Sequence, residues 1–154
     1  MNKDESIRFA ARYLEDLLSF FGINVAVTST IDDEVIQLSV PSTSLNSLLI
    51  GRNADNLRAL QHIVSMALVS KDAEVTRVNV DVASYKQHRA DRIAEKAEGW
   101  IKRVRETGKS MTVDLNAADR RVVHKLAGDY SDIETHSEGE GRERKLIISK
   151  IETE

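Results

Sequence analysis

Two short groups of residues have the types and the spacing to bind a phosphate. The first is the tetrapeptide Gly51, Arg52, Asn53 and Ala54, which separates an apolar run from a stretch with helical periodicity. A glycine lets the main chain approach a ligand closely, the start of a helix favours an anion, and Arg52 adds a positive charge. A plain corner between two helices explains the glycine equally well, so both interpretations stay open.

The second group is Arg120 and His124, which are four residues apart in a predicted helix and therefore share one face. An arginine and a histidine on an exposed helix face can hold a phosphate and stack on a base. Arg121 and Lys125 have the same spacing and would assist or steer the ligand. Taken alone, the pattern also fits an ordinary solvated helix surface.

Further cations lie at helical intervals between these two groups. They are Arg89, Arg92, Lys96 and Arg103. If this stripe faced the same way as Arg52 and Arg120, one nucleic-acid strand could run across both groups. The alternative is a solvated helix face whose charge is partly neutralised by acidic neighbours such as Asp91 and Glu95.

No group of residues has the spacing of a catalytic or metal site. The 4 histidines are scattered, and no two of them have metal-ligand spacing. P-loop, Gly-x-Ser-x-Gly and His-Glu-x-x-His motifs are absent from the sequence. We therefore expect no enzymatic activity and no cofactor. We interpret Gln61 and His62 as surface residues and Trp100 as a core or inter-domain residue.

Hydrophobic periodicity predicts the elements that must position these residues. The first half has the order helix, strand, strand, helix, helix, strand. The ranges are 6–21, 24–30, 34–40, 44–50, 54–70 and 75–82, and the last strand alternates strictly from Val78 to Val82. Gly22 is the expected stop of the first helix, and Pro41 that of the second strand.

The second half begins with a long helix over 85–107, which ends at Gly108 and would form the hinge between two small α/β units. A short strand, a helix and two strands joined by a glycine-rich turn follow. Their ranges are 111–115, 117–130, 132–138 and 144–150. Asn116 is the expected N-cap of the helix, with Asp119 in the first turn to favour the helix dipole.

Composition limits the class of protein. The 154 residues are 41% hydrophobic, which is enough for one packed domain or two small ones. The absence of cysteine excludes disulfides and fits a reducing cytoplasm. The charged start and the lack of any long apolar run predict neither a secretory signal nor membrane insertion.

Charge is unevenly distributed, although the net value is only −3. Residues 84–125 carry 11 basic and 6 acidic side chains, whereas residues 1–83 carry 7 basic and 11 acidic ones. Residues 126–154 carry 4 basic and 8 acidic ones. A basic middle is a modest indication of a polyanionic partner.

The segment 50–54, followed by Leu57, Leu60 and Gln61, resembles the GxxG loop and following helix of a KH domain. The predicted order α-β-β-α-α-β is that of the type II KH fold. The resemblance implies that about four nucleotides of a single strand are clamped at this loop. Ala54 stands where the family has its second glycine, and Asp55 adds a negative charge next to it.

The segment 115–127, followed by 136–149, is similar to the R-three-H domain, which is named for arginine-x-x-x-histidine. A KH domain, a long helix and an R-three-H domain in this order resemble the Jag (SpoIIIJ-associated) family of bacterial RNA-binding proteins. The resemblance implies an α+β fold with a KH domain over 1–83 and a linking helix plus R-three-H domain over 84–154. It also implies cytoplasmic action on RNA, linked to the cell envelope or division, and pairing with a second small KH protein.

Three functions follow as hypotheses. The first is a non-catalytic protein that binds single-stranded RNA through the residues named above. The second is an adaptor that forms a homodimer, or a heterodimer with another KH protein, through an exposed sheet edge and the amphipathic first helix. The third is single-stranded DNA binding, which shares the same chemistry and differs at the 2′-hydroxyl.

Overall fold

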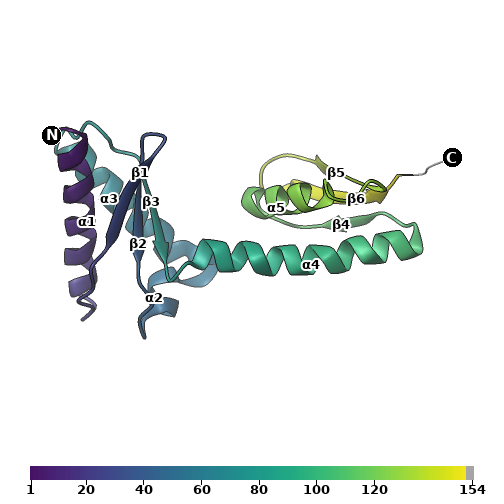
Figure 1. Ribbon diagram of the computed structural model, residues 1–154, viewed down its shortest axis with the longest axis horizontal. Coiled ribbons are helices and arrows are strands. Elements are labelled where there is room, and N and C mark those ends of the chain that lie inside the picture. The colour runs from purple at the N-terminus through teal and green to yellow at the C-terminus, as the bar shows by residue number, and fades with distance from the viewer. Residues whose placement is uncertain (152–154) are drawn as a thin grey trace. The chain divides into compact units, whose positions relative to one another are not determined.

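The computed structural model describes residues 1–151 and divides into two compact units, Met1–Lys86 and Gln87–Glu154. The boundary lies in the first turn of the long helix α4 (Tyr85–Thr107). Figure 1 shows the elements of both units. The mixture of helices with two separate small sheets makes the fold α+β, as predicted. Within the described residues, no helix has the length and apolar character needed to cross a membrane.

Unit 1 follows the predicted element order. Its elements are α1 (Lys3–Ser19), β1 (Thr28–Asp32), β2 (Val35–Val40), α2 (Asn46–Ile50), the 3-10 turn η1 (Arg52–Ala54), α3 (Asp55–Ser70) and β3 (Val78–Val82). Strand β2 lies in the middle of the sheet, antiparallel to β1 and parallel to β3. The parallel pair requires a crossover, and α2 and α3 provide it.

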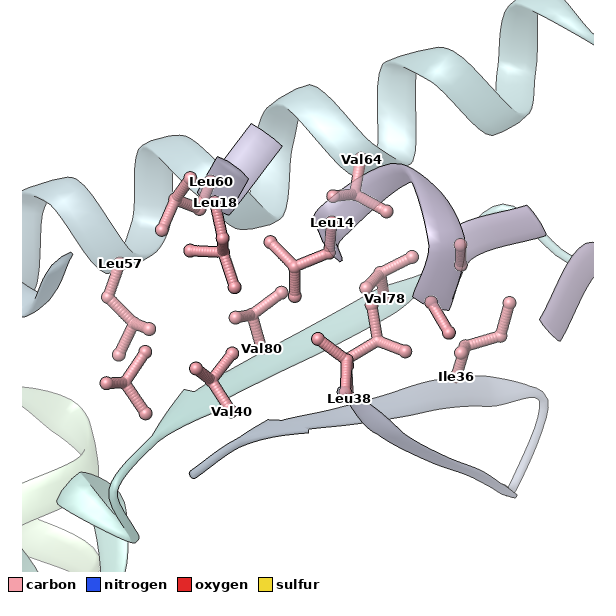
Figure 2. Close-up of a cluster of buried hydrophobic side chains, with 14 of the residues drawn as sticks. Leu14, Leu18, Ile36, Leu38, Val40, Leu57, Leu60, Val64, Val78 and Val80 are labelled. Atoms are coloured by element: carbon pink, nitrogen blue, oxygen red, sulfur yellow. The ribbon is translucent and has the colours of Figure 1, made fainter. Parts of the chain in front are cut away.

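The core of unit 1 lies between the sheet and two of its helices, as Figure 2 shows. Strands β2 and β3 alternate, so every second side chain enters this core. Helices α1 and α3 supply the opposite wall, with Leu14 and Val64 fully buried. Burying one leucine of this kind stabilises the fold by about 1.5–3 kcal/mol. The core therefore fixes α3, and with it the loop that precedes the helix.

Two strands start later than predicted. Strand β3 begins at Val78 and not at Val75, which is where the strict alternation begins. The alternation suggested a strand from Asn24, but β1 begins at Thr28. Thr28 pairs with Ser39, and β2 ends one residue later at Val40, before Pro41. In this register Pro41 would lie opposite residue 26, and a proline has no N–H group to donate, so β2 offers no partner to residues 24–26.

Unit 2 contains α4 and a second sheet. Its other elements are β4 (Met111–Val113), α5 (Ala117–Ala127), β5 (Ile133–Glu138), the 3-10 turn η2 (Gly141–Glu143) and β6 (Lys145–Lys150). Strand β6 lies in the middle and is antiparallel to both neighbours. Asn116 caps α5 as predicted, because its side chain accepts the Asp119 main-chain N–H at 2.9 Å.

A second hydrophobic core holds α4 and α5 against this sheet. The buried stripe of α4 consists of Ile93, Ala97, Ile101 and Val104. Val123 of α5 and Ile148 of β6 are fully buried in the same cluster. Trp100 is half-buried and packs against the cluster, which confirms its interpretation as a core residue.

Candidate nucleic-acid interface

Gly51 occupies a position that no other residue fits. Its φ is +73°, in the region that favours glycine. A Cβ added there would lie 2.7 Å from Cγ of Asn56, which is too close for two carbon atoms. The Asn56 side chain in turn donates a hydrogen bond to the Leu48 main-chain oxygen at 2.8 Å. The glycine is therefore required by the corner itself, whatever else the loop contacts.

The next residues of the loop project into solvent. Arg52 and Asn53 are exposed, and Asn53 has φ +54°, which asparagine tolerates better than most residues. Ala54 is left-handed too, with φ +61°, and directly precedes α3. Its methyl group packs against the hydrophobic core. Ala54 thus adopts a conformation that favours glycine, at some cost in strain.

Asp55 does not place an unopposed negative charge beside this loop. Its carboxylate forms an ion pair with the guanidinium of Arg58, one turn further along α3. Both side chains are exposed, so the pair contributes little to stability. It does reduce the repulsion that Asp55 would exert on a phosphate at the loop.

A groove beside α3 and β3 contains residues that the sequence analysis missed. Its volume is about 560 Å³, and its polar lining includes Arg58, Gln61, His62, Ser65, Arg77 and Asn79. His62 is exposed, as predicted, and Gln61 is half-buried; both line this groove. The spacing of these α3 residues at three and four positions was the signal that could have revealed a common face.

Helix α3 and strand β3 are joined by side-chain hydrogen bonds at this groove. Gln61 Oε1 accepts the main-chain N–H of Val80 at 3.1 Å, and Ser65 Oγ donates to the Thr76 oxygen at 2.6 Å. These bonds occupy the Val80 N–H group of β3 and a carbonyl group of the segment that precedes this strand. They also fix the distance between the two walls, so the groove is preformed.

A further missed cation, Lys86, lies next to one wall of this groove, where it bonds to Asn79. Its ammonium group donates to Oδ1 of Asn79, whose amide donates to Gln37 at 2.6 Å. Burial lowers the pKa of Lys86 below its ordinary value, and the nearby Asp81 carboxylate opposes this shift. The hydrogen bond to Asn79 holds the charge in a defined position.

In unit 2, Arg120 is not the exposed residue that was predicted. It is half-buried, and its Nη1 donates to the Leu115 main-chain oxygen at 2.5 Å and to the Arg144 oxygen at 3.4 Å. These carbonyl groups belong to the segments before α5 and before β6. Arg120 therefore ties two loops together, and among the described residues both of its hydrogen bonds run from one nitrogen. The N–H groups on Nε and Nη2 lie outside these bonds.

His124 is exposed, as predicted, and contacts two hydroxyl groups of β5. Its Nδ1 lies 2.5 Å from Thr135 Oγ1, and its Nε2 lies 3.4 Å from Ser137 Oγ. These contacts fix the ring against the sheet. Arg121 and Lys125 are exposed cations on the same helix.

The four cations on α4 that were predicted to form one stripe differ in their surroundings. Arg92, Lys96 and Arg103 are exposed, as a charged nucleic-acid surface requires. Arg89, however, forms a two-pronged ion pair with Asp119, with Nη2 2.7 Å from Oδ2 and Nε 3.2 Å from Oδ1. Asp119 was expected to act only on the helix dipole, but its side chain is 6% exposed and pairs α5 with α4. The Arg89 side chain therefore has a structural role in joining α4 to α5, in addition to being a candidate contact for nucleic acid.

Comparisons with known proteins add a domain family and a set of relatives. Residues 91–150 match the model of the R-three-H domain, which confirms that part of the predicted resemblance. The chain is 26% identical over 152 residues to the RNA-binding protein KhpB of Bacillus subtilis, covering 97% of this chain and 73% of that protein. It is 24% identical to the RNA-binding protein KhpB of Clostridium symbiosum, covering 96% of this chain and 65% of that protein. It spans 42% of the RNA-binding protein KhpB of Streptococcus pneumoniae, at 22% identity.

Proposed function

We propose that this chain is a non-catalytic protein that binds single-stranded RNA with two modules, a type II KH domain over residues 1–83 and an R-three-H domain over 84–154. One structural observation carries the proposal. The α3–β3 groove has two arginines and a histidine among its lining residues and no acidic side chain. The similarity to proteins named RNA-binding protein, along 97% of the chain in one case, supports the same ligand.

The KH assignment draws on topology and on the loop. The order α-β-β-α-α-β with one parallel strand pair is the order of elements that the type II KH resemblance implies. A phosphate at the loop would meet the exposed Arg52 guanidinium at the start of α3, where the helix dipole favours an anion. The following nucleotides would lie along the groove, with Arg58, His62 and Arg77 as donors.

In unit 2, the RNA strand would contact the face of α5 that carries His124 and the neighbouring cations. Arg121 and Lys125 would neutralise phosphates, and His124 would offer a ring held in place by Thr135. Arg120 would contribute the N–H groups that its two main-chain bonds leave available. Arg92 and Lys96 on α4 would raise the local concentration of the polyanion without reading its bases.

RNA is proposed over DNA because the relatives carry that name, and the 2′-hydroxyl is the group that would distinguish the two. Regulation of RNA in the bacterial cytoplasm, linked to the cell envelope or division, belongs to the same proposal. It draws on the Jag resemblance alone.

Backbone NMR of the ¹⁵N-labelled chain, titrated with a single-stranded RNA of about ten nucleotides, tests the proposal. We expect the largest shifts at Arg52, Asn53, His62 and Arg77 in unit 1, and along α5 in unit 2. Helix α1 serves as the internal control and should not shift. Saturating RNA that shifts neither region would contradict the proposal, and a matched DNA strand measures the preference for RNA.

A protein-interaction adaptor is the second candidate function, because unit 1 exposes large apolar side chains. Phe20 is 87% exposed, Met66 51% and Leu48 48%. A homodimer, or a heterodimer with a second KH protein, would cover such side chains. Size-exclusion chromatography with light scattering separates the candidates, because a strict monomer that binds RNA argues against the adaptor as the main role.

A further inference from the structure

Unit 2 contains a second groove, between the segment that precedes α5 and the turn that precedes β6. We call it the loop groove. Its lining includes Leu115, Asn116, Ala117, Arg120, Gly141 and Arg142, and its volume is about 440 Å³. Pockets for small ligands run from about 300 to 1,000 Å³. None of these residues except Arg120 belongs to the arginine–histidine pattern.

Arg120 gives the loop groove a fixed positive charge. Its Nη1 bonds to Leu115 and Arg144 hold the guanidinium between the two walls. Because the side chain is already ordered, binding a phosphate there loses little conformational entropy. A planar guanidinium also suits the oxygens of a phosphate better than an ammonium group does.

The other wall contributes a second cation and an open position. Arg142 is exposed, and the turn around it is held by the bond from Arg144 Nη1 to the Gly139 oxygen at 3.0 Å. Gly141 has φ +59°, and a Cβ added to it would meet no atom within 4 Å. The groove is therefore open directly beside Gly141.

We propose that the loop groove binds one nucleotide of the single-stranded RNA, with its phosphate on Arg120 and its base between Leu115 and Arg142. Leu115 is half-buried and gives an apolar contact, and an arginine plane stacks on a base in a sequence-tolerant way. Asp114 also lines the groove and disfavours a phosphate at its own end. The net charge of the lining still favours an anion. This inference rests on the proposed function and assigns Leu115, Gly141 and Arg142 to it.

The Gly141→Asn variant tests the proposal by filling the groove without changing its charge. Asparagine tolerates a left-handed main chain, so the turn is expected to keep its shape. Gly108→Asn is the matched control, because Gly108 has φ +71°, also has open space around its Cβ position, and does not line the groove. Fluorescence anisotropy with a labelled single-stranded RNA of about ten nucleotides gives the dissociation constant of each.

We expect Gly141→Asn to weaken binding at least about fivefold and Gly108→Asn to leave it unchanged, because one stacked base contributes on this scale. Arg142→Ala should weaken binding similarly. If the wild type binds RNA and neither groove variant weakens it, the loop groove is not a nucleotide site, while the proposed function stands. If the wild type binds no RNA at all, both proposals fail.

A second test of the loop groove uses the wild type alone. Adenosine 5′-monophosphate added to the ¹⁵N-labelled chain should shift the amides of Leu115, Ala117 and Gly141, whereas adenosine should not. Shifts with both compounds would show a base site without a phosphate contact and would contradict the role of Arg120. The absence of shifts at high nucleotide concentration would contradict the site itself.

Discussion

The carboxylate of Asp119 on α5 accepts two hydrogen bonds from the guanidinium of Arg89 on α4, at 2.7 and 3.2 Å. Asp119 is almost fully buried and Arg89 is about one-third exposed. The pair joins the long helix to the helix that carries Arg120 and His124. A substitution of Arg89 is therefore expected to disturb the position of α5. Any effect on ligand binding would follow from that disturbance.

The Arg89→Ala variant should lower the free energy of unfolding by about 1–3 kcal/mol, measured by urea denaturation. Loss of one partner leaves the other charge buried without compensation, and the partial exposure of Arg89 keeps the loss below that of a fully buried pair. Arg92→Ala removes an exposed arginine from the same helix and should change the stability by less than about 0.5 kcal/mol. Equal effects of the two changes would show that the pair contributes nothing to the fold.

Ala54→Gly should leave the stability unchanged or raise it by up to about 1 kcal/mol. The left-handed conformation at φ +61° strains an alanine, while a glycine adopts it freely. Ala59→Gly is the matched change inside α3, at an exposed helical position, and should cost about 1 kcal/mol. Thermal unfolding of both variants gives the comparison. A loss at position 54 as large as at position 59 would contradict the strain.

Lys86 should make the stability depend on pH in the alkaline range. Burial lowers its pKa in the folded chain below the ordinary 10.5, so the folded state binds fewer protons than the unfolded state in that window. The free energy of unfolding should therefore rise as the pH increases from the folded pKa towards 10.5. Lys86→Met should lack this rise, which urea titrations at several pH values detect. A variant with the same pH dependence as the wild type would refute the assignment.

Arg120→Ala should destabilise unit 2 by about 1–3 kcal/mol in chemical denaturation, because two loop carbonyls lose a charged donor. Arg121→Ala, at the exposed neighbouring position, should change the stability by less than about 0.5 kcal/mol. Any RNA-binding experiment on Arg120→Ala must therefore be compared at equal folded fraction. Equal stability of both variants would mean that the hydrogen bonds from Arg120 to the two loops do not contribute to the free energy of unfolding.

The sequence predicted the elements well because their signals are local. Apolar spacing located α4 with its buried stripe, and Asn116 marked the start of α5. The late start of β1 was not predictable in the same way, since it depends on where β2 ends as its partner. Strand pairing is a non-local property that alternation alone does not report.

The exposure of the candidate residues was predicted in part. The loop and the two exposed cations of α5 lie at the surface. Arg89, however, pairs with Asp119, and Arg120 donates to the main-chain oxygens of Leu115 and Arg144. The sequence pattern around an arginine does not show whether its side chain will contact a carboxylate or a carbonyl group in the folded chain. Gln61 and Arg77 come from different elements and meet only in the folded unit. Such juxtapositions follow from tertiary packing and could not be derived from spacing.

In the proposed function, exposed arginines and lysines of both units hold an RNA strand by its phosphates. We would first measure the dissociation constant of a short single-stranded RNA between about 50 and 200 mM salt, a range over which several phosphate contacts lose much of their affinity. The exposed Arg12→Ala is the control. We expect a steep loss of affinity with salt for the wild type and the control. In Arg52→Ala and in the Arg121→Ala, Lys125→Ala double variant, the log–log slope should be smaller by about 0.7 for each lost phosphate contact. A wild type that binds nothing, or slopes that are the same in all four proteins, would contradict the proposed function.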